Sequence, residues 1–264
     1  MVLSGQADST CSAAFAKRLR MCVLALAWRM SPGWRLVAAG NRDEMHARPS
    51  LPLARWDDGS GVIAGRDMIG GGTWLGVSEA GRFAVVTNVR EPGGADPAKA
   101  SRGGLVTGVL GGGLAAVAAD ALERFNPFNL IAIDRGAPAL LSNRPEPVAR
   151  PLAPGMHGLS NGLHDAPWPK TLALQAALSG WIGGAGKIED LFAALRDERR
   201  FDAERGEGIE PVGSPVFMCN PVYGTRCSTV VIVDAAGRGT IAERRFDADG
   251  TMTGETRLAF AWPD

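Results

Sequence analysis

A cysteine directly after Met21 is the residue of this chain best suited to do chemistry. Cys22 stands before an apolar run that ends at Trp28. If translation or processing makes Cys22 the first residue, its thiol is joined by a free α-amine. Such an amine has a pKa of about 7.7–8.0, so it can act as a base near neutral pH. The sequence therefore indicates a nucleophile that is activated by its own terminus.

The next apolar run returns a cation and a carboxylate toward this thiol. It spans Trp34 to Gly40 and continues into Asn41-Arg42-Asp43-Glu44. In a hairpin of the two runs, Arg42 and Asp43 come back to the end that holds Cys22. We expect Arg42 to lower the pKa of the thiol below its free value of about 8.5, and Asp43 to orient the amine or the guanidinium. The alternatives are an ordinary buried thiol and a salt bridge at a strand end.

Two asparagines and a late arginine complete the candidate site. Asn88 and Asn161 each end an apolar or serine-containing segment, where a side-chain amide can point at a developing oxyanion. One such donor stabilises a transition state by about 2.7–4 kcal/mol. Arg226 opens an apolar run and could reach Cys22 or a substrate carboxylate. The alternatives are turn formation, for which asparagine is favoured, and a strand-end cation.

Three other patterns resemble sites of different chemistry. Residues Gly158 to Gly162 match the GxSxG elbow of α/β-hydrolases, but the histidine that follows Ser160 is His164, which is too local to return from another loop. Gly70-Gly71-Gly72-Thr73 lacks the lysine of a phosphate-binding loop and predicts a tight turn. The histidines lack metal-ligand spacing, so we expect no metal site. They are His46, His157 and His164.

Short apolar runs between Gly, Pro, Asn and Asp clusters predict a strand-rich first half. The expected strands are Cys22–Trp28, Trp34–Gly40, Gly61–Gly65, Trp74–Val77, Arg82–Thr87, Phe128–Asp134 and Ala139–Ser142. The expected helices are Gly104–Phe125, split by its glycines, Trp168–Leu178 and Ile188–Arg199. Strands return at Ser228–Asp234, Gly239–Phe246 and Thr256–Ala261, after a loop at Arg200–Ser214. With no linker and no repeat, this order predicts one α+β domain over residues 21–264.

Composition fits a soluble globular protein. The chain has 264 residues, 45% of them hydrophobic, with 28 basic and 28 acidic side chains, which provides no basic surface for nucleic acid. No stretch approaches the roughly 20 apolar residues that span a bilayer. The four cysteines show no CxxC spacing, which is typical of a reducing compartment, so we expect a cytoplasmic protein. A disulfide between Cys219 and Cys227 is the alternative for that pair.

The first 20 residues stand apart from the rest. Lys17 to Arg20 before an apolar run is similar to the start of a signal peptide, but Arg29 interrupts that run and the small-residue pattern Ala25-Leu26-Ala27 lies inside it. We expect residues 1–20 to be a disordered extra segment. It is either the product of a start codon assigned too early, with Met21 as the true initiator, or a pro-segment whose removal exposes Cys22.

Further segments agree, in order, with one known family. The sequence resembles the NRDE family, also called the transport and Golgi organization protein 2 family, from Met21 to about Phe260. Besides Asn41–Glu44, the segments are Ala64–Asp67, Gly70–Gly76, Thr87–Arg90, Ser101–Gly103, Asn126–Leu130, Gly158–Gly162, Pro167–Lys170 and Tyr223–Arg226.

The resemblance implies a four-layer αββα sandwich of the Ntn-hydrolase type. Cholylglycine-hydrolase-type Ntn enzymes are similar in placing an N-terminal cysteine, an arginine and an aspartate after the second strand, two asparagines and a late arginine. The matching residues here are Cys22, Arg42, Asp43, Asn88, Asn161 and Arg226. The register within Asn41–Glu44 leaves Glu44 as an alternative to Asp43.

Two main hypotheses of function follow. In the first, the protein is a hydrolase without a cofactor that cleaves the amide C–N bond of a small, apolar substrate, with Cys22 as the nucleophile. In the second, it is a non-catalytic carrier or chaperone of haem or a lipid, and the same pocket holds that ligand. A third hypothesis is a protein that acts in trafficking or Golgi organisation.

Overall fold

Six antiparallel strands form the first sheet of the computed structural model, which describes residues 22–117, 119–184, 186–201 and 214–263. Their order across the sheet is β10-β1-β2-β11-β12-β13. The strands are β1 (Val23–Ser31), β2 (Trp34–Met45), β10 (Gly155–Leu159), β11 (Tyr223–Asp234), β12 (Arg238–Phe246) and β13 (Met252–Ala261). The β1–β2 hairpin lies near the centre, so its ends are held by neighbours on both sides.

Seven strands form the second sheet, and each pairs with the next along the chain. They are β3 (Ser50–Arg55), β4 (Val62–Asp67), β5 (Leu75–Ser78), β6 (Arg82–Asn88), β7 (Phe128–Asp134), β8 (Ala137–Ser142) and β9 (Val148–Pro151). The sheet is therefore a meander that begins directly after β2 ends.

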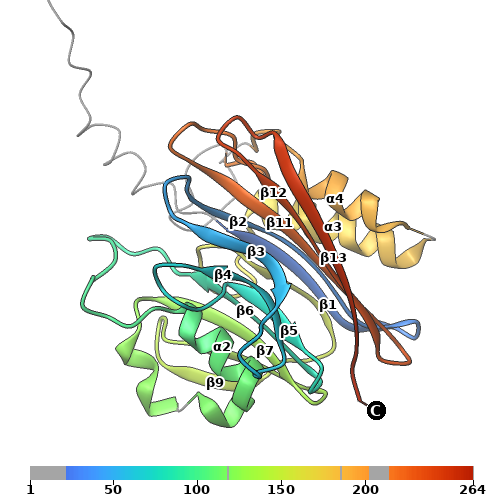
Figure 1. Ribbon diagram of the computed structural model, residues 1–264, viewed down its shortest axis with the longest axis horizontal. Coiled ribbons are helices and arrows are strands. Elements are labelled where there is room, and N and C mark those ends of the chain that lie inside the picture. Colours follow the sequence, from blue (N-terminus) through green and yellow to red (C-terminus); the bar gives the residue numbers. More distant parts are fainter. Residues whose placement is uncertain (1–21, 118, 185, 202–213, 264) are drawn as a thin grey trace, which may run out of the picture.

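Helices cover the outer face of each sheet (Figure 1). α3 (Pro169–Gly183) and α4 (Ile188–Leu195) pack on the first sheet, chiefly against β1 and β11, and α2 (Gly103–Gly112) packs on the second sheet against β5, β6 and β7. The layers follow the order helix, sheet, sheet, helix. The predicted α+β fold and its αββα sandwich are confirmed.

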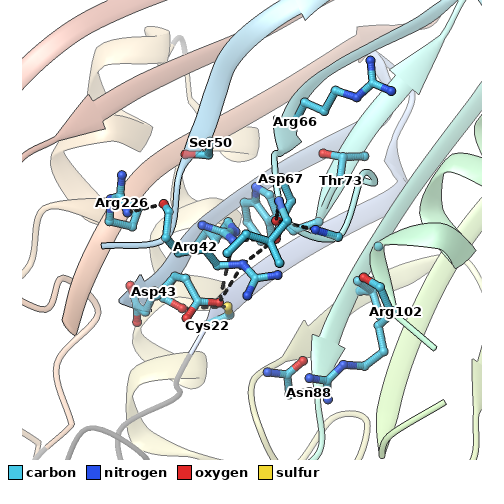
Figure 2. A pocket seen from close by; sticks show the side chains of 18 of the residues that line it. Cys22, Arg42, Asp43, Ser50, Arg66, Asp67, Thr73, Asn88, Arg102 and Arg226 are labelled. Atoms are coloured by element: carbon cyan, nitrogen blue, oxygen red, sulfur yellow. Dashed lines mark hydrogen bonds and ion pairs between the residues drawn. The ribbon is translucent and has the colours of Figure 1, made fainter. Parts of the chain in front are cut away.

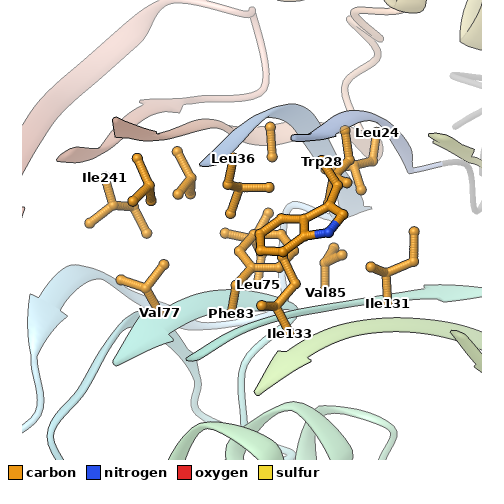
Figure 3. Close-up of a cluster of buried hydrophobic side chains, with 14 of the residues drawn as sticks. Leu24, Trp28, Leu36, Leu75, Val77, Phe83, Val85, Ile131, Ile133 and Ile241 are labelled. Carbon is orange, nitrogen blue, oxygen red and sulfur yellow. The ribbon is translucent and has the colours of Figure 1, made fainter. Parts of the chain in front are cut away.

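Alternation along the strands explains why the central ones are buried on both faces. On β1, Leu24, Leu26 and Trp28 point into the core between the sheets, whereas the residues between them point at the helices. Phe83 and Ile133 reach the same core from the second sheet, as Figure 3 shows. Strands covered on both faces read as continuous apolar runs, which is why the sequence pattern found them.

The strands that the sequence pattern missed are β3, β9 and β10, and all three lie at sheet edges. Edge strands have one face or side open to solvent, so their side chains are mixed in polarity and can include proline, as at Pro52 and Pro151. The expected helix over Gly104–Phe125 is shorter than predicted. α2 ends at Gly112 because Gly113 takes a φ of +80°, and only the 3₁₀ turns η1 (Leu114–Ala116) and η2 (Ala119–Arg124) follow.

Two expectations fall outside the described residues. The extra segment over residues 1–20, with Cys11, is one of them, and most of the loop expected at Arg200–Ser214 is the other. In the part of the chain that is described, no helix is long and apolar enough to cross a membrane.

Candidate functional site

A cavity of about 630 Å³ lies between the two sheets, where β1 begins and β2 ends. The first sheet contributes Cys22 and Arg42 to its wall, and the second sheet contributes Asp67 and Asn88. Figure 2 shows Cys22, Arg42 and Asp43 together, with Asn88 across the cavity from them. The site is therefore built from residues that only the packing of the two sheets brings together.

Strand register sets a cysteine on each side of Arg42. The pairing of Val23 with Asn41 continues to Cys22 beside Arg42, and β11 pairs Cys227 with Arg42. Because side chains alternate along each strand, the thiols and the guanidinium all face the second sheet. The hairpin that the sequence predicted does return Arg42 to Cys22.

Cys22 is half-buried in the wall of this cavity. Its Sγ lies 3.9 Å from the carbonyl oxygen of Asp43, and its own carbonyl oxygen accepts a hydrogen bond of 2.8 Å from Ser160 Oγ. Burial and the charge of Asp43 raise the pKa of the Cys22 thiol to about 11, and Arg42 offsets only part of that rise. The shift is opposite in direction to the lowered pKa that the sequence led us to expect, because desolvation of the thiolate outweighs the nearby cation.

Arg42 belongs to a cluster of ion pairs on the cavity wall. Its Nη2 lies 3.3 Å from Asp67 Oδ2, and Arg48 Nε donates to the same oxygen at 2.7 Å. Glu44 Oε2 lies 3.7 Å from Arg42 and 3.8 Å from Arg48. Burial opposes ionisation of Asp67, but hydrogen bonds from Arg48 and from backbone N–H groups lower its pKa. Two carboxylates therefore hold the guanidinium of Arg42 beside the thiol.

Asp43 lies on the other face of β2, toward the helices. Its Oδ1 accepts a hydrogen bond of 2.7 Å from Thr225 Oγ1, and its backbone carbonyl accepts one from Tyr223. Burial raises the pKa of this carboxyl to about 7, although Lys170 and Thr225 act to lower it. Its second oxygen, Oδ2, is buried and has no hydrogen-bond partner among the described residues.

The structure separates Asp43 from Glu44, which the sequence could not do. Asp43 is 5% exposed and borders Cys22, whereas Glu44 faces the cavity and pairs with Arg42. Of these two carboxyl groups, Asp43 therefore has the larger effect on the pKa of the Cys22 thiol.

The two candidate asparagines are adjacent, but only one faces Cys22. Asn88, at the end of β6, lines the main cavity. Asn161 lines a neighbouring cavity of about 150 Å³, and its Nδ2 donates to the Asn88 carbonyl oxygen at 2.9 Å. The Arg90 N–H in turn donates to the Asn161 carbonyl oxygen. Asn161 therefore holds the backbone at Asn88, and the expected pair of oxyanion donors is reduced to Asn88 in this geometry.

Arg226 does not reach toward Cys22. Its Nη1 donates to the carbonyl oxygens of Met45, His46 and Arg48 at 2.9, 2.9 and 3.0 Å. Arg226 lies where the β2–β11 register shifts, and its hydrogen bonds stabilise the turn that follows β2. The structure gives this arginine a supporting role at the cavity wall.

The patterns set aside in the sequence have structural roles. Ser160 supports the Cys22 backbone, as described above. Gly70 to Thr73 form the expected turn after β4, where Asp67 Oδ1 accepts hydrogen bonds from the N–H groups of Ile69 and Gly70. No disulfide joins the described cysteines, so the alternative pairing of Cys219 with Cys227 is wrong.

Four residues near the thiol were not anticipated: Asp67, Lys170, Cys227 and Glu243. Burial and the neighbouring Glu243 raise the pKa of the Cys227 thiol, and burial raises that of the Glu243 carboxyl. Asp67 and Lys170 stand within segments that carry the family resemblance, which is the signal that could have found them. Glu243 shows no such signal, because a glutamate in a strand usually faces solvent.

Comparison with known proteins gives the family. Residues 21–248 match the family described as Transport and Golgi organisation 2. The Transport and Golgi organization protein 2 homolog of Bos taurus is 34% identical over 85% of this chain and 92% of its own length. The chain belongs to this family. The Homo sapiens homolog is 33% identical over 90% of this chain and 97% of its own length, and the Drosophila melanogaster protein is 29% identical over 89% and 93%.

Two solved structures resemble this chain only distantly. A Caenorhabditis elegans N-acylethanolamine-hydrolyzing acid amidase ortholog aligns with a TM-score of 0.47 at 12% identity, over 80% of this chain and 92% of its own. Penicillin V acylase from Agrobacterium tumefaciens aligns with a TM-score of 0.45 at 12% identity, over 91% and 86%.

Proposed function

We propose that this protein is an amidohydrolase whose nucleophile is Cys22, exposed as the first residue of the mature chain. The observation that carries the proposal is the buried Asp43 Oδ2, which has no hydrogen-bond donor among the described residues and lies beside a cysteine that faces a cavity. A buried carboxylate oxygen without a partner is costly. An N–H group of the α-amine of a terminal Cys22 would supply the missing donor, and the amine would add a compensating charge once it is protonated.

The raised thiol pKa makes a base necessary. A thiol with a pKa of about 11 is almost wholly protonated at neutral pH, so it needs an acceptor for its proton as it attacks. A free α-amine on the same residue can take that proton, whereas a peptide nitrogen cannot. The thiolate sulfur then bonds to the amide carbonyl carbon, and the carbonyl oxygen becomes an oxyanion.

Asn88, which lines the same cavity, would stabilise this oxyanion through its side-chain amide. Collapse of the intermediate breaks the C–N bond, and the ammonium of Cys22 returns its proton to the leaving amine. A thioester remains on Cys22. Water attacks it with the amine again as the base, which releases the carboxylic acid and restores the thiol.

Arg42 and Asp43 tune these steps from opposite faces of β2. Arg42, held by Asp67, favours the thiolate that forms during attack. Asp43 orients the amine and balances its charge once the amine is protonated.

The cavity favours a substrate with an apolar part. Leu51 and Ile69 line it although they are 50% and 67% exposed, and Trp74 lies deeper in the same wall. Exposed large apolar side chains at a cavity often mark the place where a ligand binds. We propose an N-acyl amide with an apolar acyl chain, acted on in the cytoplasm, where isolated thiols stay reduced.

Turnover of N-acyl amides and acyl-amino acids by protein that begins at Cys22 tests this proposal. Cys22→Ala should abolish turnover, and Cys219→Ser, which alters an exposed thiol, should leave it unchanged. No turnover of any amide, together with saturable binding of haem seen as a one-equivalent shift of the Soret band, would instead support the carrier hypothesis.

A further inference from the structure

Two histidines and an aspartate converge at the edge of the first sheet, away from the cavity of Cys22. His157 lies on the edge strand β10, and His164 and Asp165 lie in the turn that follows. Asp165 Oδ2 is 3.4 Å from His157 Nδ1 and 3.2 Å from His164 Nδ1. All three ligand atoms lie within 4.8 Å of one another. The sequence spacing had led us to expect no metal site here.

Hydrogen bonds fix how these groups face one another. His157 Nε2 lies 2.8 Å from the Ala153 carbonyl oxygen, which is only an acceptor, so Nε2 carries a proton. In the neutral ring, Nδ1 then presents its lone pair to Asp165 Oδ2, which is also an acceptor. Two acceptors that face each other need a cation between them, either a proton or a metal ion.

The distances fit a metal ion. Zinc bonds to nitrogen and oxygen ligands at about 2.0–2.2 Å, which makes the edge between two ligand atoms of a tetrahedral site about 3.3 Å. The two Nδ1–Oδ2 distances are already 3.4 and 3.2 Å. The two imidazole nitrogens lie within 4.8 Å of each other, so all three ligand atoms can surround one ion.

The surroundings also match those of metal ligands. The backbone carbonyl of Ala153 orients His157, and the Gly158 N–H donates to Asp165 Oδ1 at 2.7 Å, which are the kinds of supporting hydrogen bond that metal ligands make. The imidazoles are about 10% and 9% exposed, but the Asp165 side chain is 41% exposed, so an ion and a water ligand can reach the site.

We propose that His157 Nδ1, His164 Nδ1 and Asp165 Oδ2 bind a zinc-like divalent transition-metal ion, with water as the fourth ligand. This site is independent of the proposed hydrolase activity. A bound ion joins β10 to the turn after it, and the short segment between them carries Ser160 and Asn161. The ion would therefore stabilise the segment that supports the backbones of Cys22 and Asn88.

A cation at the rim gives the proposal a distinctive test. Arg150 Nη2 lies 3.5 Å from His164 Nδ1, so it competes with a metal ion for that nitrogen and repels its charge. Titration of the full chain with Zn²⁺ by calorimetry should show one equivalent bound through these residues. His157→Ala and His164→Ala should each weaken binding at least about tenfold, and Arg150→Ala should strengthen it. His46→Ala, which changes a histidine of another region, serves as the matched control and should bind as the wild type does.

Cobalt(II) distinguishes this site from the thiols. We expect its visible absorption without a thiolate-to-cobalt charge-transfer band, and the same spectrum in Cys22→Ala. Asp165→Asn keeps the shape of the side chain but weakens it as a metal ligand, so it should also weaken zinc binding. It serves as the test if circular dichroism shows that a histidine variant is unfolded. A folded wild type that binds no zinc would overturn the proposal, because a proton would then be the bridging cation. Binding that survives the histidine changes but is lost with the cysteines would overturn it as well.

Discussion

Neighbouring residues of one strand act on opposite sides of the thiol. Arg42 faces the cavity and Asp43 faces the helices, because successive side chains of a strand alternate. One side chain favours the thiolate electrostatically, and the other opposes it while offering an unfilled acceptor. Two residues that are adjacent in sequence therefore shift the pKa of the Cys22 thiol in opposite directions.

Removing the cation should make the thiol less reactive. In Arg42→Ala the pKa of Cys22 should rise further and its alkylation by iodoacetamide near neutral pH should slow, because the lowering effect of the guanidinium is lost. Arg42→Lys should keep part of the rate, since it keeps the charge without the planar fork. Peptide mapping by mass spectrometry gives the rate at each thiol. The exposed Cys219 is the internal reference, and Arg55→Ala, at an exposed ion pair, is the control. An unchanged rate at Cys22 in Arg42→Ala would contradict this role.

Asp43 should make the full-length chain less stable as pH rises. Its folded pKa of about 7 lies above the unfolded value, so the folded state keeps a proton that the unfolded state loses between about pH 4 and 7. Stability from this group is therefore present at low pH and lost through pH 7. Between pH 4 and 8, the free energy of unfolding of Asp43→Asn, measured in urea, should rise by about 2–4 kcal/mol relative to that of the wild type. Parallel pH curves for Asp43→Asn and wild type would refute the assignment.

At the scale of elements, a turn and a helix meet too closely for a side chain. A Cβ at Gly72, between β4 and β5, would lie 2.4 Å from the backbone of Gly103 at the start of α2. A contact this short with backbone cannot be relieved by a side-chain rotation. Packing against α2 therefore explains Gly72, whereas Gly71 has no atom near its Cβ position and instead takes a positive φ of 72°.

Gly72→Ala should accordingly destabilise the protein by about 1–3 kcal/mol, through overpacking against backbone. Gly104→Ala, one residue along in α2, has no atom within 4 Å of the added Cβ and should be neutral or stabilising. Thermal unfolding of the two variants compares them directly. Equal stability of the two variants would contradict the prediction, because the turn would then have shifted to accommodate the added methyl group.

Sequence pattern predicted the central elements well and the edges poorly. The β7 bounds Phe128–Asp134 match the predicted strand, because an apolar run covered on both faces carries a clear signal. β3, β9 and β10 carry no such run. The position of Arg42 beside Cys22 followed from the hairpin, but the use of Arg226 on carbonyl oxygens depends on a register shift that no local pattern encodes. The raised thiol pKa likewise depends on burial that only tertiary packing produces.

For the whole molecule, the interface between the two sheets both stabilises the fold and assembles the cavity. Leu26 is fully buried there, so Leu26→Ala should cost about 2–5 kcal/mol in urea unfolding. Leu172→Ala, on α3 and 49% exposed, should change stability by less than about 0.5 kcal/mol. Similar losses for both would mean that the packed layers do not carry the stability.

The central claim is that Cys22 acts through its own free amine, and one paired measurement tests it. Amide turnover is compared between protein that begins at Cys22, verified by intact mass, and the same protein with one glycine ahead of Cys22. The extension leaves the thiol and cavity in place but turns the base into a peptide nitrogen. We predict turnover by the first protein and none by the second, with both still alkylated at Cys22. Equal turnover by the two proteins would contradict the account.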